Sequence, residues 1–319
     1  QPRDRSRHGD PLLPGDPLRP RPPSVTELKV AVRRATMTLA EAGIASAPVD
    51  ALLLAAHLMG QEVPEVRRLM VLGGVDAPEG YEDLVAERAS RIPLQHITGR
   101  AGFRYLELRV GPGVFVPRPE TELVVELAVA ALDALRSGSA AGPDRSGLVT
   151  PVVVDLATGS GAIALAVKQE RPLADVYAVE LSALAHGWAV ANRDHLRLDV
   201  TIELSDALTA YEELVGLVDV VTCNPPYIPV GQVPIDPEVR DHDPALALYG
   251  GSEDGLATPR AMAARAAQLL RPGGVLVMEH AETQGSSLPR ALAATGAWLT
   301  VVDHLDLVGR PRCLVATRA

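Results

Sequence analysis

The second half of the chain alternates short apolar runs with longer amphipathic segments. Apolar runs of five or six residues are typical of buried strands, and apolar residues at a spacing of three and four are typical of helices. The predicted strands cover residues 152–156, 175–179, 218–223 and 274–279, and the predicted helices cover 162–169, 183–193 and 258–270. This alternation predicts an α/β fold with a doubly wound, mostly parallel sheet and helices on both faces.

The first part of the chain has the spacing of helices only. Helices are predicted over residues 25–42, 48–59, 63–72 and 81–91, so residues 24–92 are expected to form a small helical domain for substrate recognition. Ser24 and Glu27 fit a capping box at its start. Residues 1–23 are rich in Pro and Arg and lack an apolar stretch, which predicts a disordered tail and no signal peptide.

A different pattern joins these two parts. Residues 103–110 alternate in polarity, Gly111-Pro112-Gly113 is a turn signal, and an apolar stretch follows at 114–116. We expect a β-hairpin linker over residues 93–116, followed by a helix over 120–135 and a surface loop over 137–147. The catalytic domain would then cover residues 117–319.

Composition narrows the function classes. The 319-residue chain is 47% hydrophobic and carries a net charge of −10, which disfavours a protein that wraps nucleic acid, because such binding neutralises phosphates. Cys223 and Cys313 have no metal-like spacing, so no metal is expected and both are interpreted as reduced thiols of a cytoplasmic protein. The apolar stretch over residues 51–59 is too short to cross a membrane.

A glycine-rich turn follows the first predicted strand. Asp155-Leu156-Ala157-Thr158-Gly159-Ser160-Gly161 runs directly into a helix, and its glycines permit a sharp turn and the close approach of a ligand. Glu180 ends the next strand, where an acid can accept hydrogen bonds from ribose hydroxyls. On this pattern alone NAD and S-adenosylmethionine fit equally well, and a tight turn without a ligand stays open.

The tetrapeptide Asn224-Pro225-Pro226-Tyr227 distinguishes between these two candidate cofactors. It follows the predicted strand 218–223 and therefore faces the same edge of the sheet as the glycine loop. An amide nitrogen is a poor nucleophile with two N–H donors, which the Asn224 side-chain oxygen and the Pro225 carbonyl can accept. The prolines stiffen the loop, and Tyr227 can stack on a planar group near a sulfonium. The motif favours methyl transfer from S-adenosylmethionine to a planar amide or amine nitrogen.

Taken together, these motifs resemble the release factor glutamine methyltransferase family, which methylates the glutamine of the Gly-Gly-Gln motif in class I peptide chain release factors. The resemblance extends from about residue 50 to the C-terminus. It rests on five separated blocks: residues 93–99, 116–122, 155–164, 224–227 and 250–256.

The resemblance implies a Rossmann-like, S-adenosylmethionine-dependent methyltransferase domain behind a helical domain and a hairpin, and it implies roles for particular residues. Catalytic roles are implied for Asn224, Pro225 and Tyr227. Substrate contacts are implied for Asn224, Pro225, Pro226, Tyr227 and Phe103. Cofactor contacts are implied for Ala157, Thr158, Gly159, Ser160, Gly161, Glu180, Asp206, Ala207, Asn224, Arg118, Glu120 and Thr121.

Some positions depart from the pattern of this family. Ala157 stands where many methyltransferases have glycine, and Glu180 replaces a frequent aspartate. His280-Ala281 follows Glu279 where a glycine is expected nearby, and we interpret His280 as a packing or surface residue.

Three other functions stay open. An N6-adenine DNA or RNA methyltransferase could use the same tetrapeptide, but it would need a basic groove that this acidic chain does not suggest. A glutamine methyltransferase for a ribosomal protein would have nearly the same motifs. A non-catalytic ligand-binding scaffold would not require Asn224 or the glycines. The expected partners are class I release factors, without nucleic acid or membrane.

Overall fold

The computed structural model describes residues 26–136 and 150–319. The chain divides into two compact units, residues 1–85 and 86–319, and each is described by itself. The expected disordered tail over 1–23, the expected capping residue Ser24 and the expected surface loop over 137–147 lie outside the described residues.

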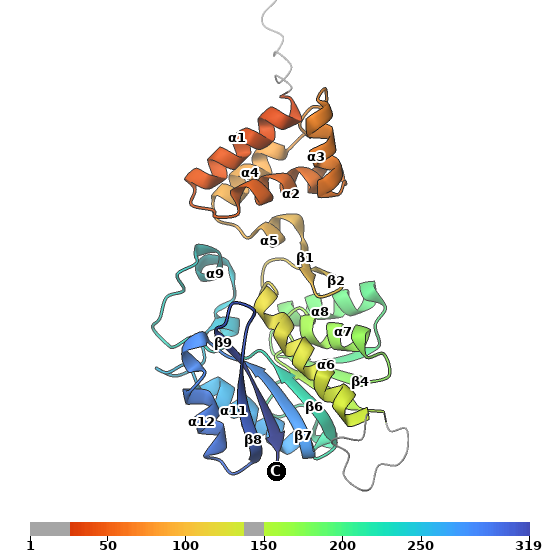
Figure 1. The fold of residues 1–319 in the computed structure, drawn as a ribbon, viewed down its shortest axis with the longest axis vertical. Helices are drawn as coiled ribbons and strands as arrows, with labels where there is room; N and C mark the ends of the chain where they lie inside the picture. Colours follow the sequence, from red (N-terminus) through yellow and green to blue (C-terminus); the bar gives the residue numbers. More distant parts are fainter. Residues whose placement is uncertain (1–25, 137–149) are drawn as a thin grey trace, which may run out of the picture. The chain divides into compact units, whose positions relative to one another are not determined.

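The first unit is built from helices, as the apolar spacing predicts. They are α1 (Leu28–Glu41), α2 (Ala47–Met59), α3 (Val63–Leu72) and α4 (Tyr81–Ala89), the last of which crosses the boundary between the units (Figure 1). One face of α1 is buried through Leu28, Val32, Ala35 and Leu39. The buried Tyr81 hydroxyl donates to the Ala51 carbonyl at 2.8 Å and ties α4 to α2.

The start of α1 differs from the prediction. The helix begins at Leu28, so Glu27 is its N-cap residue and not the third helical residue of a capping box. Tertiary backbone pairing explains the later start: Leu28 N–H donates to the Val75 carbonyl, and Ala77 N–H donates to the Thr26 carbonyl, both at 2.8 Å. These bonds stabilise extended backbone at Thr26 and Glu27, where the helix was expected.

The second unit contains a seven-stranded sheet in the order β5-β4-β3-β6-β7-β9-β8. Its strands are β3 (Val152–Leu156), β4 (Asp175–Glu180), β5 (Val200–Leu204), β6 (Val218–Cys223), β7 (Leu270–Glu279), β8 (Trp298–Leu305) and β9 (Pro311–Arg318). The first five strands in this order are parallel, and β9 pairs antiparallel with both β7 and β8. The predicted doubly wound, mostly parallel α/β fold is confirmed.

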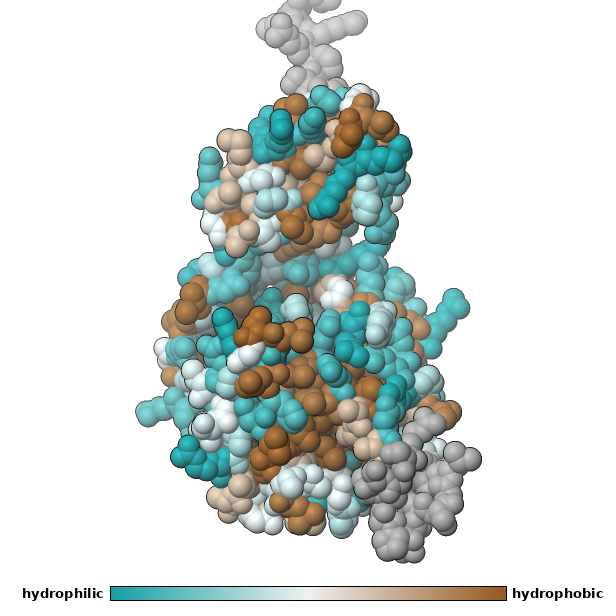
Figure 2. Space-filling view, in the orientation of Figure 1, coloured by the Kyte–Doolittle hydropathy of each residue, from teal (hydrophilic) through white to brown (hydrophobic). Residues whose placement is uncertain are grey.

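Helices cover both faces of this sheet (Figure 1). They include α6 (Glu122–Arg136), α7 (Ala162–Glu170), α8 (Ala183–Leu196), α11 (Ala257–Leu269) and α12 (Ser287–Ala293). The shorter helices α5 (Leu94–Thr98), α9 (Pro237–His242) and α10 (Ala245–Leu248) lie in the connecting segments. Apolar residues of α6 and α7 form one core cluster with the sheet, and those of α11 and α12 form another. Figure 2 shows apolar residues gathered on the α6 side of this unit.

The predicted hairpin is present, but its turn lies earlier than predicted. Strands β1 (Arg100–Phe103) and β2 (Leu106–Arg109) pair around a turn at Arg104, whereas residues 111–116 form no strand. Arg104 has a left-handed φ of 53°. Two interactions hold it there, since its N–H donates to Glu122 at 2.9 Å and its guanidinium donates twice to Glu170 at 2.8 Å.

The last strands of the sheet, β7 to β9, also differ from the sequence prediction. Strand β7 begins at Leu270, so the expected turn over 271–273 lies inside the strand, at an irregularity of its pairing with β6. The antiparallel strands β8 and β9 were not predicted. Among the described residues, no helix is long and apolar enough to cross a membrane.

Candidate active site

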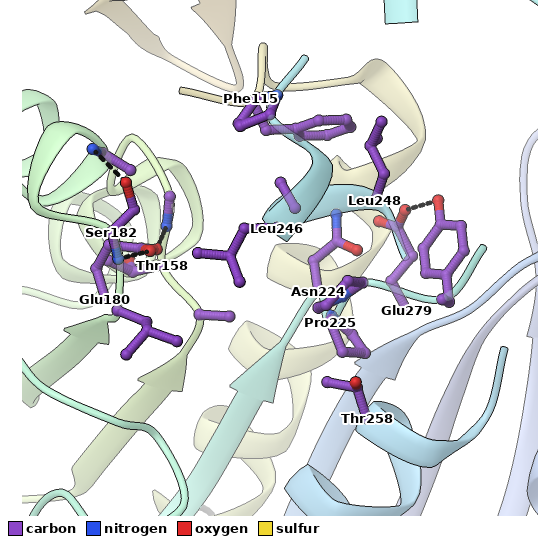
Figure 3. A pocket seen from close by; sticks show the side chains of 18 of the residues that line it. Phe115, Thr158, Glu180, Ser182, Asn224, Pro225, Leu246, Leu248, Thr258 and Glu279 are labelled. Carbon is purple, nitrogen blue, oxygen red and sulfur yellow. Dashed lines mark hydrogen bonds between the residues drawn. The ribbon is translucent and has the colours of Figure 1, made fainter. Parts of the chain in front are cut away.

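A pocket of about 1000 Å³ opens at the carboxyl ends of the parallel strands of the second unit. Strand β3 lies between β4 and β6, so the chain order of the sheet reverses beside β3. Ligands of doubly wound sheets bind at this kind of switch point. The loops after β3, β4, β5 and β6 and the last residue of β7 contribute lining residues, and Figure 3 shows several of them around the pocket.

The loop after β3 has an unusual backbone. Ala157, Gly159 and Gly161 all have left-handed φ angles, of 60°, 59° and 84°. The Glu180 carboxylate at the end of β4 holds this loop by accepting from Gly159 N–H at 2.9 Å and from Ser182 N–H at 2.8 Å (Figure 3). The sequence predicted that this loop and Glu180 lie together, and Ala157, Gly159 and Glu180 share one wall of the pocket.

A buried carboxylate lies beneath the same loop. Asp155 is fully buried in β3, where it accepts from the Thr158 hydroxyl at 2.6 Å and from the Thr222 hydroxyl at 2.7 Å. Burial raises the pKa of Asp155 to about 6, against the opposing effect of both hydroxyls. Because Thr222 belongs to β6, Asp155 connects the glycine loop to the strand that carries the tetrapeptide.

The two loop glycines differ in what surrounds them. A side chain at Gly159 would enter open space, and Gly159 lines the pocket. A Cβ atom at Gly161 would lie 2.9 Å from Leu165 Cδ1 and 3.5 Å from Ala189 Cβ, and Gly161 does not line the pocket. Gly161 therefore lies behind the lining and lets the start of α7 pack closely, and the expected ligand contact at Gly161 stays a prediction.

The tetrapeptide residues line the other side of the pocket. Asn224 directly follows β6, and its Nδ2 group donates to the Thr121 hydroxyl oxygen at 3.3 Å. The Tyr227 hydroxyl donates to Glu279 Oε1 at 3.1 Å (Figure 3). The Tyr227 backbone carbonyl accepts from the Gln284 amide at 3.0 Å, so both ends of this residue are held.

Residues of the second predicted block form the wall between these sides. Arg118, Glu120 and Thr121 all line the pocket. The Arg118 guanidinium donates to the buried Asp243 carboxylate at 2.7 Å and lies 5.0 Å from the centre of the Phe115 ring. On the far side, Asp206 and Ala207 line the pocket after β5.

The structure corrects the expected position of Phe103. Its side chain is 1% exposed in the apolar core beside α6, opposite Leu106 in the hairpin, and it does not line the pocket. The alternation of the hairpin directs Phe103 to the core face. The aromatic residues that line the pocket are Phe115, Tyr227 and Tyr249.

Other lining residues were missed. Glu279 ends β7 and could have been found by the rule that ligands bind at the carboxyl ends of strands. Arg312 lies on the unpredicted strand β9, and residues 244–249 have no clear pattern. His280 is buried away from the pocket lining and bonds to Asp303 at 2.7 Å, which fits the packing interpretation.

The chain matches two family models, the PrmC N-terminal domain over residues 31–99 and the methyltransferase small domain over 146–235. It is 50% identical to the release factor glutamine methyltransferase of Streptomyces coelicolor, covering 90% of this chain and 97% of that protein. The chain belongs to the release factor glutamine methyltransferase family. The corresponding protein of Mycolicibacterium smegmatis is 46% identical over 92% of this chain and 99% of its own length.

Two further proteins are similar to this chain, one in sequence and one in fold. A 4-amino-L-phenylalanine/4-methylamino-L-phenylalanine methyltransferase of Streptomyces pristinaespiralis is 41% identical over 90% of this chain and 92% of that protein. The catalytic domain of human Mettl16, solved with an RNA hairpin, has a TM-score of 0.50 at 13% identity, covering 74% of this chain and 82% of that one. The latter likeness shows the methyltransferase fold alone.

Metal ligands do not gather at this site. Within residues 26–136 and 150–319, no group of three or more His, Cys, Asp or Glu side chains could hold a metal ion.

The buried Asp155 carboxyl predicts a specific pH dependence. Its pKa is about 6 in the folded protein, above the ordinary aspartate value of 3.8, so the protonated form stabilises the fold and this contribution is lost as the pH rises from about 4 to 6. Asp155→Asn removes this titration and keeps a side chain of the same shape. The difference in unfolding free energy between wild type and variant should therefore move by about 2 kcal/mol in favour of the variant between pH 4 and pH 7.

Denaturant unfolding of both proteins across this pH range provides the measurement. Other titrating groups are common to the two proteins and cancel in the difference. A difference that stays constant with pH would contradict the shifted pKa of Asp155.

Proposed function

We propose that this protein transfers a methyl group from S-adenosylmethionine to the side-chain amide nitrogen of the glutamine in the Gly-Gly-Gln motif of class I peptide chain release factors. The observation that carries the proposal is the position of Asn224 and Pro225. They open into the same pocket as Gly159 and Glu180, so an amide clamp and a nucleoside-binding loop share one cavity. The names of the relatives support release factors as the substrate.

The residues of the first wall fit the proposed cofactor. Glu180 accepts two backbone N–H groups and, as a carboxylate, has lone pairs left for ribose hydroxyls. The methionine part would lie along Ala157, Thr158, Gly159 and Ser160, and adenine would lie near Asp206 and Ala207. Arg118, Glu120, Thr121 and Asn224 would complete the cofactor side. The pocket is at the upper end of the size range of small-molecule sites, which leaves room for a substrate side chain beside the cofactor.

The chemistry follows from the two acceptors of the clamp. The Asn224 side-chain oxygen and the Pro225 carbonyl accept the two N–H groups of the glutamine amide, which fixes the nitrogen with its lone pair towards the methyl group that the cofactor supplies. Positive charge reaches the nitrogen during in-line transfer, so both hydrogen bonds strengthen in the transition state. The surplus proton then leaves to water. Pro226 stiffens the loop, and Tyr227 packs beside the planar amide.

The pocket wall is less suited to nucleic acid. The arginines that line it both lie beside carboxylates: Arg118 bonds to Asp243 at 2.7 Å, and Arg312 lies 3.6 Å from Asp306. Neither is an isolated cation for a phosphate. A reaction on release factors would take place in the cytoplasm, where translation terminates.

The direct test is methyl transfer from labelled S-adenosylmethionine. An intact release factor should be labelled on the Gly-Gly-Gln glutamine, and its glutamine-to-alanine variant should not. Ribosomal protein, DNA and free 4-aminophenylalanine serve as competing substrates, the last because of the relative from Streptomyces pristinaespiralis. Faster labelling of any of these three would overturn the proposed substrate.

The two glycines of the loop should separate cofactor binding from packing. Gly159→Ala places a methyl group in the open pocket and should weaken S-adenosylmethionine binding about tenfold or more, or about 1.4 kcal/mol. Gly161→Ala places one against Leu165 and should chiefly lower the melting temperature. Calorimetric titration and thermal unfolding of both variants measure the two effects. Wild-type cofactor binding in Gly159→Ala, with weakened binding in Gly161→Ala, would remove Gly159 from the cofactor site.

Asn224→Ala should lower kcat by about 100-fold, because one transition-state hydrogen-bond acceptor is lost. Binding of S-adenosylmethionine should fall much less than kcat, since Asn224 is one contact on the cofactor side and the loop after β3 and Glu180 are intact. Single-turnover methylation and cofactor titration in the same variant provide the comparison. Methylation at the wild-type rate would make the tetrapeptide a turn and not a clamp.

We propose that the first unit recognises the protein substrate. All residues that line the pocket lie at Gly113 or later, which leaves the helices free of a chemical role. Hydrogen exchange of the full-length protein should therefore show protection in α1–α4 when a glutamine-to-alanine release factor is added. Protection confined to the second unit would contradict this role.

A further inference from the structure

The backbone of the tetrapeptide is not held by the sheet. Pro225 and Pro226 have no N–H group, and in the part of the chain that the structure describes the backbone of residues 224–227 forms no hydrogen bond with another backbone group. The next such bond along the chain is that of Ile228, whose N–H donates to the Leu248 carbonyl at 2.8 Å. The position of the clamp oxygens therefore depends on contacts with other segments.

The side chain of Gln284 makes such a contact. Gln284 ends the short helix η3 (Glu282–Gln284) after β7 and is 4% exposed. Its Nε2 group donates to the Tyr227 carbonyl and to the Asp254 carbonyl, each at 3.0 Å. Its Oε1 atom accepts from Ala281 N–H, also at 3.0 Å. One buried amide thus joins three backbone segments: the end of the tetrapeptide, the turn before α11 and the segment after β7.

The partners of this amide fix its orientation. A side-chain amide can be rotated by half a turn, which exchanges its oxygen and its NH₂ group. A backbone N–H only donates and a backbone carbonyl only accepts, so a rotated Gln284 would lose all three bonds and place like groups against each other. None of these groups titrates, so the arrangement does not depend on a protonation state.

A glycine contacts the Tyr227 carbonyl as well. Gly255 has a left-handed φ of 70°, and a Cβ atom there would lie 2.2 Å from the Tyr227 carbonyl oxygen and 3.0 Å from Gln284 Nε2. A Cβ atom at Gly250 would lie 2.0 Å from the Gly255 carbonyl oxygen. Both glycines belong to the block over residues 250–256 on which the family resemblance rests, and no residue of this block lines the pocket. The block therefore serves close backbone packing behind the tetrapeptide.

We propose that Gln284 is a positioning residue, which together with Gly255 sets the place of the tetrapeptide by holding the Tyr227 carbonyl. The inference rests on the proposed amide clamp. Only the rigid Pro226 separates this carbonyl from Pro225, so a displacement of Tyr227 also displaces the clamp oxygens. Methyl transfer is sensitive to displacements of about 1 Å, and Gln284 consequently affects the rate although it lies behind the pocket lining.

A substitution of similar size tests Gln284. Gln284→Met removes the donors and the acceptor, and we expect kcat on the release factor to fall about tenfold or more. The affinity for S-adenosylmethionine should stay near wild type, because the proposed cofactor wall follows β3, β4 and β5. Gln169→Met, the same change at an exposed glutamine of α7 outside the pocket lining, should match wild type. Wild-type kcat in Gln284→Met, or a fall of cofactor affinity in step with kcat, would overturn the positioning role.

Gln284→Glu adds a pH profile that a general loss of packing would not produce. The introduced carboxyl still accepts from Ala281 N–H. Its protonated form donates to one of the two carbonyls, whereas its ionised form repels both. The ratio of kcat in this variant to kcat in wild type should therefore fall as the pH rises from about 6 to about 9, since burial raises the pKa of a carboxyl into this range. A ratio that does not change with pH would contradict the proposal.

Two glycines of the turn provide an independent pair of variants. Gly255→Ala and Gly251→Ala both place a side chain at a left-handed φ, of 70° and 78°, so both should lower the melting temperature. Only the first meets the Tyr227 carbonyl, because the atom nearest to a Cβ at Gly251 is Thr258 Oγ1 at 3.5 Å. We expect kcat to be about tenfold lower in Gly255→Ala than in Gly251→Ala. Equal kcat in the two folded variants would count against the contact.

A substrate-free crystal structure separates this inference from the proposed function. In Gln284→Met, the Tyr227 carbonyl and the Asn224 side chain should be displaced from their wild-type positions, while the loop over residues 157–161 stays in place. If the displacement is seen but the wild-type protein does not methylate release factors, the proposed substrate is wrong and the positioning role stands. If the wild-type protein methylates release factors but the tetrapeptide of the variant keeps its position, the positioning role is overturned.

Discussion

One buried carboxylate joins the two halves of the active site. Asp155 accepts a hydroxyl from the loop that follows β3 and another from the neighbouring strand β6. The first loop carries the proposed cofactor contacts, and β6 ends in the tetrapeptide. Methyl transfer requires the donor and acceptor atoms in line at short distance. The spacing between these two segments is therefore the constraint on which the rest of the site depends, and Asp155 lies where that spacing is set.

Two further carboxylates at the strand ends also accept hydrogen bonds from neighbouring segments. Glu180 holds the glycine loop and the start of α8, and Glu279 accepts from the Tyr227 hydroxyl. Each carboxylate follows or ends a parallel strand, so the rigid sheet positions it. The loops between strands and helices thus obtain their order from acceptors fixed in the sheet, and the proposed clamp does not depend on the loop backbone alone.

The sequence predicted the parallel strands well because their apolar runs are buried on both faces, which leaves a clear signal in Val152–Leu156 and Val218–Cys223. The half-exposed β8 has no such run and was missed. The expected position of Phe103 was wrong for a related reason. A motif gives the residue type, but whether a side chain faces the pocket, as Phe115 does, or the core depends on packing that is not local in sequence.

The central claim is that Asn224 and Pro225 clamp the nitrogen of a glutamine amide beside the glycine loop. A crystal structure of this protein with S-adenosylhomocysteine and a release factor tests it most directly. The account predicts that the glutamine side-chain nitrogen lies within about 3.2 Å of both the Asn224 side-chain oxygen and the Pro225 carbonyl, with the cofactor sulfur on its open face. A glutamine that contacts neither oxygen, or that enters the pocket along another wall, would contradict it.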